Sequence, residues 1–342
     1  MAGVTCPELS LAETIVDIAT FAQLKEAVHD KWSGPSTLRL TNDIDFPTDG
    51  SVPSGGIILK YAVRIVGACS STSLVVSGTV SAGTCMLDAK EVDRHFYVKT
   101  SVQFSTAEVV FEKLALVNGK KTGSGVDGGA VYAYETGATR FEEVIFKDNT
   151  APNDDNGGAV SASGSGKATF TSCRFLGNKA KGEYSYGGAI YTWKTASSFT
   201  ACTFENNEAR YGGAVYLTKG SSSTFTLCTF QGNRAWSESY GHNVMVWGYP
   251  SDTSSASFYA CTFLDLLSDS NRGVRKYSSD DSFTFYDNAP PLPPGMVLPP
   301  SPPSPPPQSP PSPPSSSSGA DSAAAIGGAV VGVLVALMGI GY

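Results

Sequence analysis

Between residues 36 and 288, short apolar runs alternate with runs rich in Gly, Ser, Thr and Asn. In the second half of this region most apolar runs contain a Phe, and the residue two positions earlier is Val, Cys or Phe. Residues two positions apart in a β-strand point to the same face of the strand. The pattern predicts short strands that bury one face through these pairs: Val144 and Phe146, Cys173 and Phe175, Cys202 and Phe204, Cys228 and Phe230, Cys261 and Phe263, and Phe283 and Phe285.

Two signatures recur in a constant order along residues 128–288. Gly-Gly-Ala followed by Val or Ile begins at residues 128, 157, 187 and 212, and Gly241-His242 is a degraded copy. Each repeat also contains Phe-x-x-Asn, and the Asn residues are Asn149, Asn178, Asn207 and Asn233, with a last copy at Asn288. A period of 25 to 30 residues is typical of a solenoid. We therefore predict an all-β fold, a right-handed parallel β-helix in which equivalent Phe and Asn side chains stack between coils.

The residues before these repeats predict the start of the solenoid. Within residues 36–127, five runs have strand-like composition, which we interpret as irregular first coils: 37–46, 57–67, 74–80, 95–104 and 109–118. Thr20 and Gln23 have capping-box spacing, and Phe21, Leu24, Val28 and Trp32 share one helical face. We expect the N-terminal segment, residues 1–35, to contain a short helix that caps the first coil.

The chain after the repeats changes composition twice. Residues 289–322 are rich in Pro and Ser, which predicts a disordered, extended polyproline stalk. Residues 323–342 carry no charge and, as an apolar helix, would just span a bilayer core. The same layout matches a signal that is replaced by a glycolipid anchor. Both alternatives attach the protein to a membrane, and the sequence does not decide between them.

Charge and cysteine content narrow the classes of function. The net charge is −7 and no block of Lys or Arg occurs, which argues against nucleic acid as a partner. Cys173, Cys202, Cys228 and Cys261 lack the close spacing of metal ligands, so we interpret them as a buried apolar ladder. Cys69 and Cys85 lie outside that ladder and are the candidate disulfide pair.

The expected location is the cell surface, membrane-anchored or extracellular. The chain shows no recognisable N-terminal signal peptide, because its first twenty residues lack a basic region and contain Glu8, Glu13 and Asp17. The stalk and the apolar tail carry the expectation of a surface location.

Acidic and aromatic residues recur together in the loops just before the Gly pairs. Carboxylates accept hydrogen bonds from sugar hydroxyls or bind Ca²⁺, and aromatic rings stack on sugar rings. We therefore predict a glycan-binding strip along one edge, with Ca²⁺ as a possible ligand and no other cofactor; ordinary solvated turns are the alternative. The candidate residues are Asp127, Asp154, Asp155, Glu183, Tyr184, Tyr186, Glu208, Tyr211, Trp236, Glu238 and Tyr240.

The Gly-Gly-Ala and Phe-x-x-Asn copies resemble the repeats of chlamydial polymorphic outer membrane proteins. The resemblance covers roughly half of the chain and implies a right-handed β-helix of the pectin-lyase-like type with an adhesin-like role. The chain departs from those proteins after residue 288, where its Pro-rich segment is instead similar to the hydroxyproline-rich wall glycoproteins of plants and green algae.

Pectin-lyase-like folds also include polysaccharide lyases and hydrolases. Lyases need Ca²⁺-binding carboxylates and a basic residue, whereas the hydrolases place several Asp around the scissile bond. Asp154-Asp155 and Gly241-His242 echo hydrolase motifs without a complete set. The leading hypothesis is therefore a membrane-tethered, non-catalytic adhesin-like or glycan-binding protein, with no catalytic residue assigned. A polysaccharide lyase or hydrolase and an inert structural spacer are the alternatives.

Overall fold

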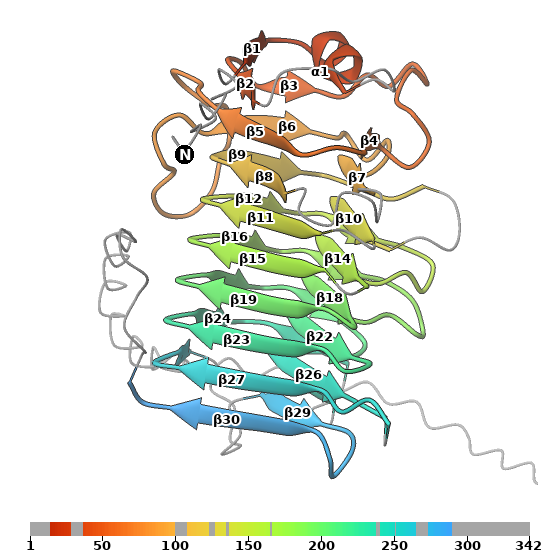
Figure 1. The fold of residues 1–342 in the computed structure, drawn as a ribbon, viewed down its shortest axis with the longest axis vertical. Coiled ribbons are helices and arrows are strands. Elements are labelled where there is room, and N and C mark those ends of the chain that lie inside the picture. The colour runs from red at the N-terminus through yellow and green to blue at the C-terminus, as the bar shows by residue number, and fades with distance from the viewer. Residues whose placement is uncertain are drawn as a thin grey trace, which may run out of the picture. The chain divides into compact units, whose positions relative to one another are not determined.

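The computed structural model describes residues 14–28, 37–99, 108–122, 127–134, 137–164, 166–236, 240–249, 251–264 and 273–288. These residues wind into a parallel β-solenoid whose coils stack along one axis (Figure 1). The predicted fold class is therefore confirmed. The Pro-rich segment 289–322 and the apolar segment 323–342 lie outside the described residues. No helix among the residues that are described is long and apolar enough to cross a membrane.

Four parallel sheets run along the described part of the solenoid, and each coil contributes one strand to most of them. Sheet A consists of β1 (Ile15–Ile18), β2 (Thr37–Leu40), β5 (Val63–Gly67), β8 (Glu108–Glu112), β11 (Ala138–Glu142), β15 (Lys167–Thr171), β19 (Ala196–Thr200), β23 (Ser222–Thr226), β27 (Ser255–Tyr259) and β30 (Ser282–Tyr286). Sheet B consists of β3 (Ile44–Asp45), β6 (Cys85–Asp88), β9 (Leu114–Val117), β12 (Ile145–Lys147), β16 (Arg174–Leu176), β20 (Thr203–Glu205), β24 (Thr229–Gln231) and β28 (Thr262–Phe263).

The other two sheets complete each coil. Sheet C consists of β4 (Ile57–Leu59), β7 (Phe96–Val98), β10 (Val131–Tyr134), β14 (Val160–Ser163), β18 (Ile190–Trp193), β22 (Val215–Thr218), β26 (Val244–Trp247) and β29 (Val274–Lys276). The short sheet D consists of β13 (Thr150–Ala151), β17 (Lys179–Ala180), β21 (Glu208–Ala209) and β25 (Arg234–Ala235).

Two ladders of stacked Phe rings fill the interior. The expected ladder in sheet B joins Phe146, Phe175, Phe204, Phe230 and Phe263, with successive centroids 4.8–5.0 Å apart. A second ladder in sheet A joins Phe141, Phe170, Phe199, Phe225 and Phe258 at 4.7–4.9 Å. These distances equal the spacing of hydrogen-bonded strands, so each ring stacks because its strand is in register.

The last Phe pair belongs to a different ladder from the one expected. Phe285 pairs with Phe258 in sheet A, so the motif that ends at Asn288 does not continue the sheet B ladder. The sequence spacing was misleading because strands of both sheets carry a buried Phe two positions after another buried residue, for example Ala256 before Phe258 in sheet A.

Glycine and asparagine fix the turns of each coil. Gly157 has a φ of +68°, and a Cβ there would lie 2.3 Å from the carbonyl oxygen of Val160. Gly158 has no such φ, but its Cβ would lie 2.0 Å from the Gly188 carbonyl oxygen of the next coil. The ladder Asn residues are buried, and Asn178 Oδ1 accepts hydrogen bonds from the backbone N (3.1 Å) and Nδ2 (3.0 Å) of Asn149. Consecutive coils are therefore joined by amide side chains as well as by strands.

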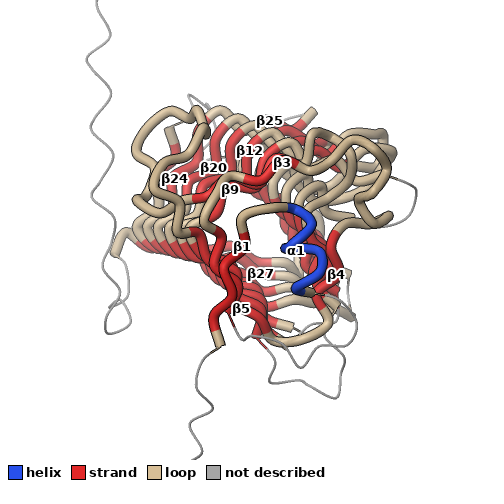
Figure 2. Tube along the Cα trace, turned by 90° about the horizontal axis from the view of Figure 1, so that it is seen from above, coloured by secondary structure: helices blue, strands red, loops and turns tan. Residues whose placement is uncertain are grey.

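The N-terminal end is covered by helix α1 (Phe21–Ala27), as expected (Figure 2). Thr20 and Gln23 form the capping box, and Leu24 is fully buried in the core. The ring of Phe21 packs 4.7 Å from that of Phe46. Trp32, which we assigned to the same helical face, lies outside the described residues.

Residues 74–80 form a loop and not the expected strand. Leu74, Val76 and Val80 pack on the outward face of sheet B, against residues that include Ile145 and Leu176. The outward face of sheet B carries an apolar patch there. The apolar side chains of the loop are buried by covering this patch, so they need not form a strand. A disulfide joins Cys69 and Cys85, with Cα atoms 5.3 Å apart, and closes this loop at its base.

Candidate functional site

The loops before the Gly pairs connect sheet D to sheet C, and three consecutive loops bring aromatic rings into contact. Tyr186 and Tyr211 share a parallel β-bridge, and their stacked rings have centroids 5.2 Å apart. The ring of Tyr240 is 4.4 Å from that of Tyr211. We call the five side chains Tyr184, Tyr186, Tyr211, Trp236 and Tyr240 the aromatic strip. The structure thus brings together the aromatic residues that the sequence analysis proposed.

Two members of the aromatic strip are open to solvent. Tyr184 is 58% exposed and Trp236 is 53% exposed, whereas the other three are partly buried. Tyr184 and Trp236 are therefore the rings of the aromatic strip that solvent reaches most readily.

Arg210 lies between these two exposed rings. Its guanidinium carbon is 6.0 Å from the centroid of Tyr184 and 5.4 Å from those of Tyr211 and Trp236. Its Nη1 is 3.4 Å from Glu183 Oε1. Arg210 was not among the candidates that the sequence pattern indicated. Its signal becomes visible only after the coils are aligned, because it then occupies the position of Trp236 one coil earlier.

The aromatic surface continues onto the outward face of sheet C. The ring of Tyr216 is 4.6 Å from that of Tyr186, and Trp247 meets Tyr211 edge to face at 6.1 Å. Tyr277 stacks on Trp247 with centroids 3.6 Å apart and is 65% exposed. Rings from four coils are therefore in contact over this edge of the solenoid.

The acidic candidates divide into two groups. Asp154 and Glu183 lie beside the aromatic strip, because Asp154 accepts a hydrogen bond from the Tyr184 backbone N (2.8 Å) and Glu183 Oε1 is 3.4 Å from Arg210 Nη1. Glu208 lies on sheet D, with its Oε2 3.9 Å from Lys179 Nζ. Asp154 and Glu183 are exposed and Glu208 is partly buried, so their carboxylates remain accessible to a ligand. Glu238 lies outside the described residues.

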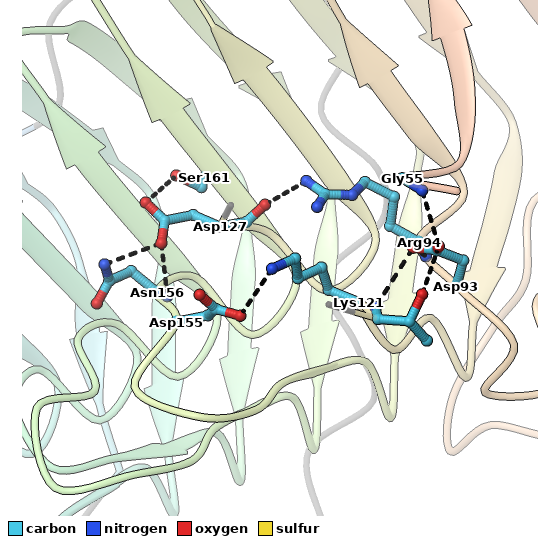
Figure 3. Close-up of polar contacts among 9 residues, drawn as sticks. Gly55, Asp93, Arg94, Lys121, Asp127, Asp155, Asn156 and Ser161 are labelled. Carbon is cyan, nitrogen blue, oxygen red and sulfur yellow. Dashed lines mark hydrogen bonds and ion pairs between the residues drawn. The ribbon is translucent and has the colours of Figure 1, made fainter. Parts of the chain in front are cut away.

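Asp127 and Asp155 take part in an interior polar network (Figure 3). Asp155 is 5% exposed, and its Oδ2 is 3.2 Å from Nζ of Lys121, which is also buried. Asp127 Oδ1 accepts hydrogen bonds from the backbone N and Nδ2 of Asn156, both at 3.0 Å, and Oδ2 accepts one from Ser161. Burial raises the pKa of Asp127 above its ordinary value.

This placement differs from the exposed row of carboxylates that the sequence suggested. The loop position is the same as in the other coils, but two buried cations contact the acidic residues from inside. Lys121 Nζ donates to the Asp155 carboxylate, and the Arg94 guanidinium donates to the Asp127 carbonyl oxygen. The Asp155 carboxylate is held by an ion pair with Lys121, and the Asp127 carboxylate by hydrogen bonds from Asn156 and Ser161. Both residues therefore join coils instead of displaying charge.

Three of the four ladder thiols are buried, as expected, and Cys261 is partly buried against the core. Cys173, Cys202 and Cys228 are buried, and each donates to a Phe carbonyl of an adjacent coil, for example Cys202 Sγ to Phe170 O at 3.5 Å. Burial raises the pKa of the Cys202 and Cys228 thiols, which keeps them protonated. Within the described part of the chain, no group of three or more His, Cys, Asp or Glu is arranged to hold a metal ion.

His95 gives a pH-dependent prediction for the solenoid. Its ring is fully buried, Nε2 donates to the Leu87 carbonyl oxygen (2.9 Å), and burial lowers its pKa from 6.5 to about 4. Between pH 6.5 and 4, His95 is therefore protonated in the unfolded chain but stays neutral in the folded chain. Stability should therefore fall as the pH drops through this window, by about 3 kcal/mol from His95 alone.

Urea unfolding at pH 7 and pH 4 would measure this loss. The non-titrating variant His95→Gln, which keeps a donor near Leu87, should lose less stability than the wild type over the same interval by that amount. Equal losses in the two proteins would show that His95 does not control the acid sensitivity.

Residues 122–289 match the family model described as a right handed beta helix region. The match spans the regular coils and, together with the parallel sheets, supports a fold of the pectin-lyase-like type. No curated protein matches the chain.

Proposed function

We propose that this chain is a non-catalytic glycan-binding protein of the cell surface, and that the aromatic strip binds a polysaccharide laid along the solenoid. The observation that carries the proposal is the pair of exposed rings, Tyr184 and Trp236, which flank Arg210 on consecutive coils. Aromatic faces stack on sugar rings, and a guanidinium donates several hydrogen bonds in a fixed geometry.

The spacing of the coils supports an extended ligand. Neighbouring coils are about 4.8 Å apart, so a chain of sugars parallel to the axis would meet a new set of loop side chains at about every residue. The accessible carboxylates of Asp154 and Glu183 lie beside the rings and can accept hydrogen bonds from sugar hydroxyls.

The surface location forms part of the same proposal. In it, residues 289–322 act as a stalk and residues 323–342 as a membrane helix or an anchor signal. The composition of these segments supports this role.

A retention assay tests the glycan-binding role. The full chain is mixed with insoluble wall polysaccharides, with and without Ca²⁺, and both retention and released products are measured. We expect retention without cleavage, and a roughly tenfold weaker affinity for Trp236→Ala or Tyr184→Ala, which corresponds to about 1.4 kcal/mol.

The matched control is Tyr286→Ala, which removes an exposed ring from sheet A, away from the aromatic strip. Unchanged retention in folded Trp236→Ala and Tyr184→Ala would reject the strip as the binding surface. Release of oligosaccharides would favour a polysaccharide lyase or hydrolase, and absence of retention on every polysaccharide would favour a structural spacer.

A further inference from the structure

One column of outward side chains on sheet A changes from threonine to tyrosine at the C-terminal end of the described solenoid. The last outward position of consecutive strands aligns in register. Threonine occupies it in three coils, and tyrosine occupies it in the final two. The column reads Glu112, Glu142, Thr171, Thr200, Thr226, Tyr259 and Tyr286.

Tyr259 and Tyr286 are stacked almost face to face. Their ring centroids are 4.4 Å apart and the rings are 5° from parallel. The backbone around the pair is held by strand pairing and by a 2.8 Å hydrogen bond from the Ala260 N to the Tyr286 carbonyl oxygen. Tyr286 is 44% exposed and Tyr259 is partly buried, so reagents in solution can reach the pair.

Other tyrosine pairs among the described residues lack this combination. Tyr97 and Tyr132 stack at 5.2 Å with 16° between the rings. The rings of Tyr211 and Tyr240 are equally close but inclined by 43°. The C-terminal pair on sheet A is therefore the one that is close, parallel and exposed.

This geometry suits the coupling of two phenoxyl radicals. Unpaired electron density in such a radical lies partly on the ring carbons next to the C–OH carbon, in orbitals perpendicular to the ring. A bond between two rings must therefore form along that perpendicular, which is the direction in which stacked rings face each other. Reacting atoms held near contact distance need little further ordering.

We propose that Tyr259 and Tyr286 are an oxidative cross-linking site, where a haem peroxidase acting with hydrogen peroxide joins the two rings as dityrosine. The enzyme removes one hydrogen atom from each phenol, and these two hydrogen atoms reduce one hydrogen peroxide to two waters. The radicals couple through one C–C bond between carbons next to the two hydroxyl-bearing carbons. The hydrogen on each coupled carbon then moves to the neighbouring oxygen and restores both phenols.

The cross-link would fasten the last described strand of sheet A. Within the described residues β30 pairs with a single neighbour, β27, whereas every sheet A strand from β2 to β27 pairs with two. A bond between residues 27 positions apart in the sequence would prevent β30 from separating from β27 without breaking a covalent bond. The disulfide between Cys69 and Cys85 already joins residues near the opposite end.

The experiment treats the dilute full chain with a haem peroxidase and a small excess of hydrogen peroxide. Dityrosine fluorescence is followed, and digested peptides from the monomer fraction are analysed by mass spectrometry. We expect one linked species that joins the peptides containing Tyr259 and Tyr286 and has lost two hydrogen atoms. Its yield should not depend on protein concentration, because the reaction is intramolecular.

Tyr286→Phe should abolish this species and most of the monomer fluorescence. The matched control Tyr132→Phe removes the phenol from a different stacked pair, Tyr97 and Tyr132, and should leave the yield unchanged. Circular dichroism of both variants shows whether the solenoid is intact. Absence of the linked peptide, its persistence in folded Tyr286→Phe, or cross-links that form only between molecules would overturn the proposal.

Discussion

Gly157→Ala should lower the free energy of unfolding by roughly 4 kcal/mol. Two costs add in this variant. The φ of +68° is unfavourable for a residue with a Cβ, at about 1–2 kcal/mol, and the new Cβ would lie 2.3 Å from the Val160 carbonyl oxygen. Overpacking a rigid site costs about a further 1–3 kcal/mol, because the nearest atoms are backbone and cannot rotate away. Chemical denaturation of the purified variant measures the sum.

Gly50→Ala separates the two costs. Gly50 has a φ of +84°, but a Cβ there would meet no atom within 4 Å. We expect a loss of about 1–2 kcal/mol, from the backbone conformation alone. If both variants lost the same stability, the close approach to the Val160 carbonyl oxygen would carry no cost and the structural account of Gly157 would be wrong.

Asn178→Ala should have an effect of similar size, roughly 4 kcal/mol. The side chain accepts two hydrogen bonds from Asn149 and donates from Nδ2 to the Phe146 carbonyl oxygen and to Asn207 Oδ1, both at 3.0 Å. Removing it leaves the buried Asn149 backbone N without its acceptor, and Asn149 Nδ2, Asn207 Oδ1 and the Phe146 carbonyl oxygen each lose one hydrogen bond. A buried group left without a partner costs about 1–3 kcal/mol, and the cavity left by the side chain adds to this loss. The unfolding midpoint and hydrogen exchange of the neighbouring backbone amides would both report the loss.

Asn206→Gly is the control for the ladder. Asn206 is exposed, lies next to Asn207 and has a φ of +55°, a conformation that glycine adopts readily. The equivalent residues in adjacent coils are Gly177 and Gly232. We expect a change within about 1 kcal/mol. A loss as large as that of Asn178→Ala would mean that corner conformation, and not the amide ladder, determines stability.

The regular coils could be predicted well from the sequence because every coil must stack its side chains on those of the next coil. A Phe in sheet B has to stack on the Phe of the next coil, so the motif appears once in each period. The sheet A ladder escaped notice although it obeys the same rule, because the Phe residues of its regular coils, such as Phe170 and Phe199, are not followed three residues later by the Asn that marks the sheet B motif.

The first coils were harder to predict because they lack the repeated motifs, so the structure of each depends on its own contacts. The run 74–80 has strand composition, yet its apolar side chains cover a neighbouring sheet. Whether such a run pairs or packs depends on which outer patch is apolar, and that patch comes from residues such as Ile145 and Leu176, far away in the sequence.

The sequence predicted the aromatic half of the candidate site, but only the exposed part of its charged half, Asp154 and Glu183. Stacking of Tyr186 on Tyr211 follows from equivalent loop positions, which the repeat reveals. The inward placement of Asp155 depends on Lys121, a buried cation from the preceding coil. The residues around Asp155 in the sequence do not indicate this partner. Pairing between coils therefore decides which carboxylates face solvent.

The variable period of the repeats has a consequence for how such a molecule can diversify. Asn178 and Asn207 are 29 residues apart and Asn207 and Asn233 are 26 apart, yet the ladder hydrogen bonds have nearly equal lengths of 3.0 and 2.9 Å. Length differences are absorbed in loops and do not reach the core. An in-frame duplication of one period would thus lengthen the molecule by a coil, and exchange of a loop between coils would move a recognition element along the axis. Engineered arrays with chosen loop order should be accessible from this chain by recombination at the Gly pairs.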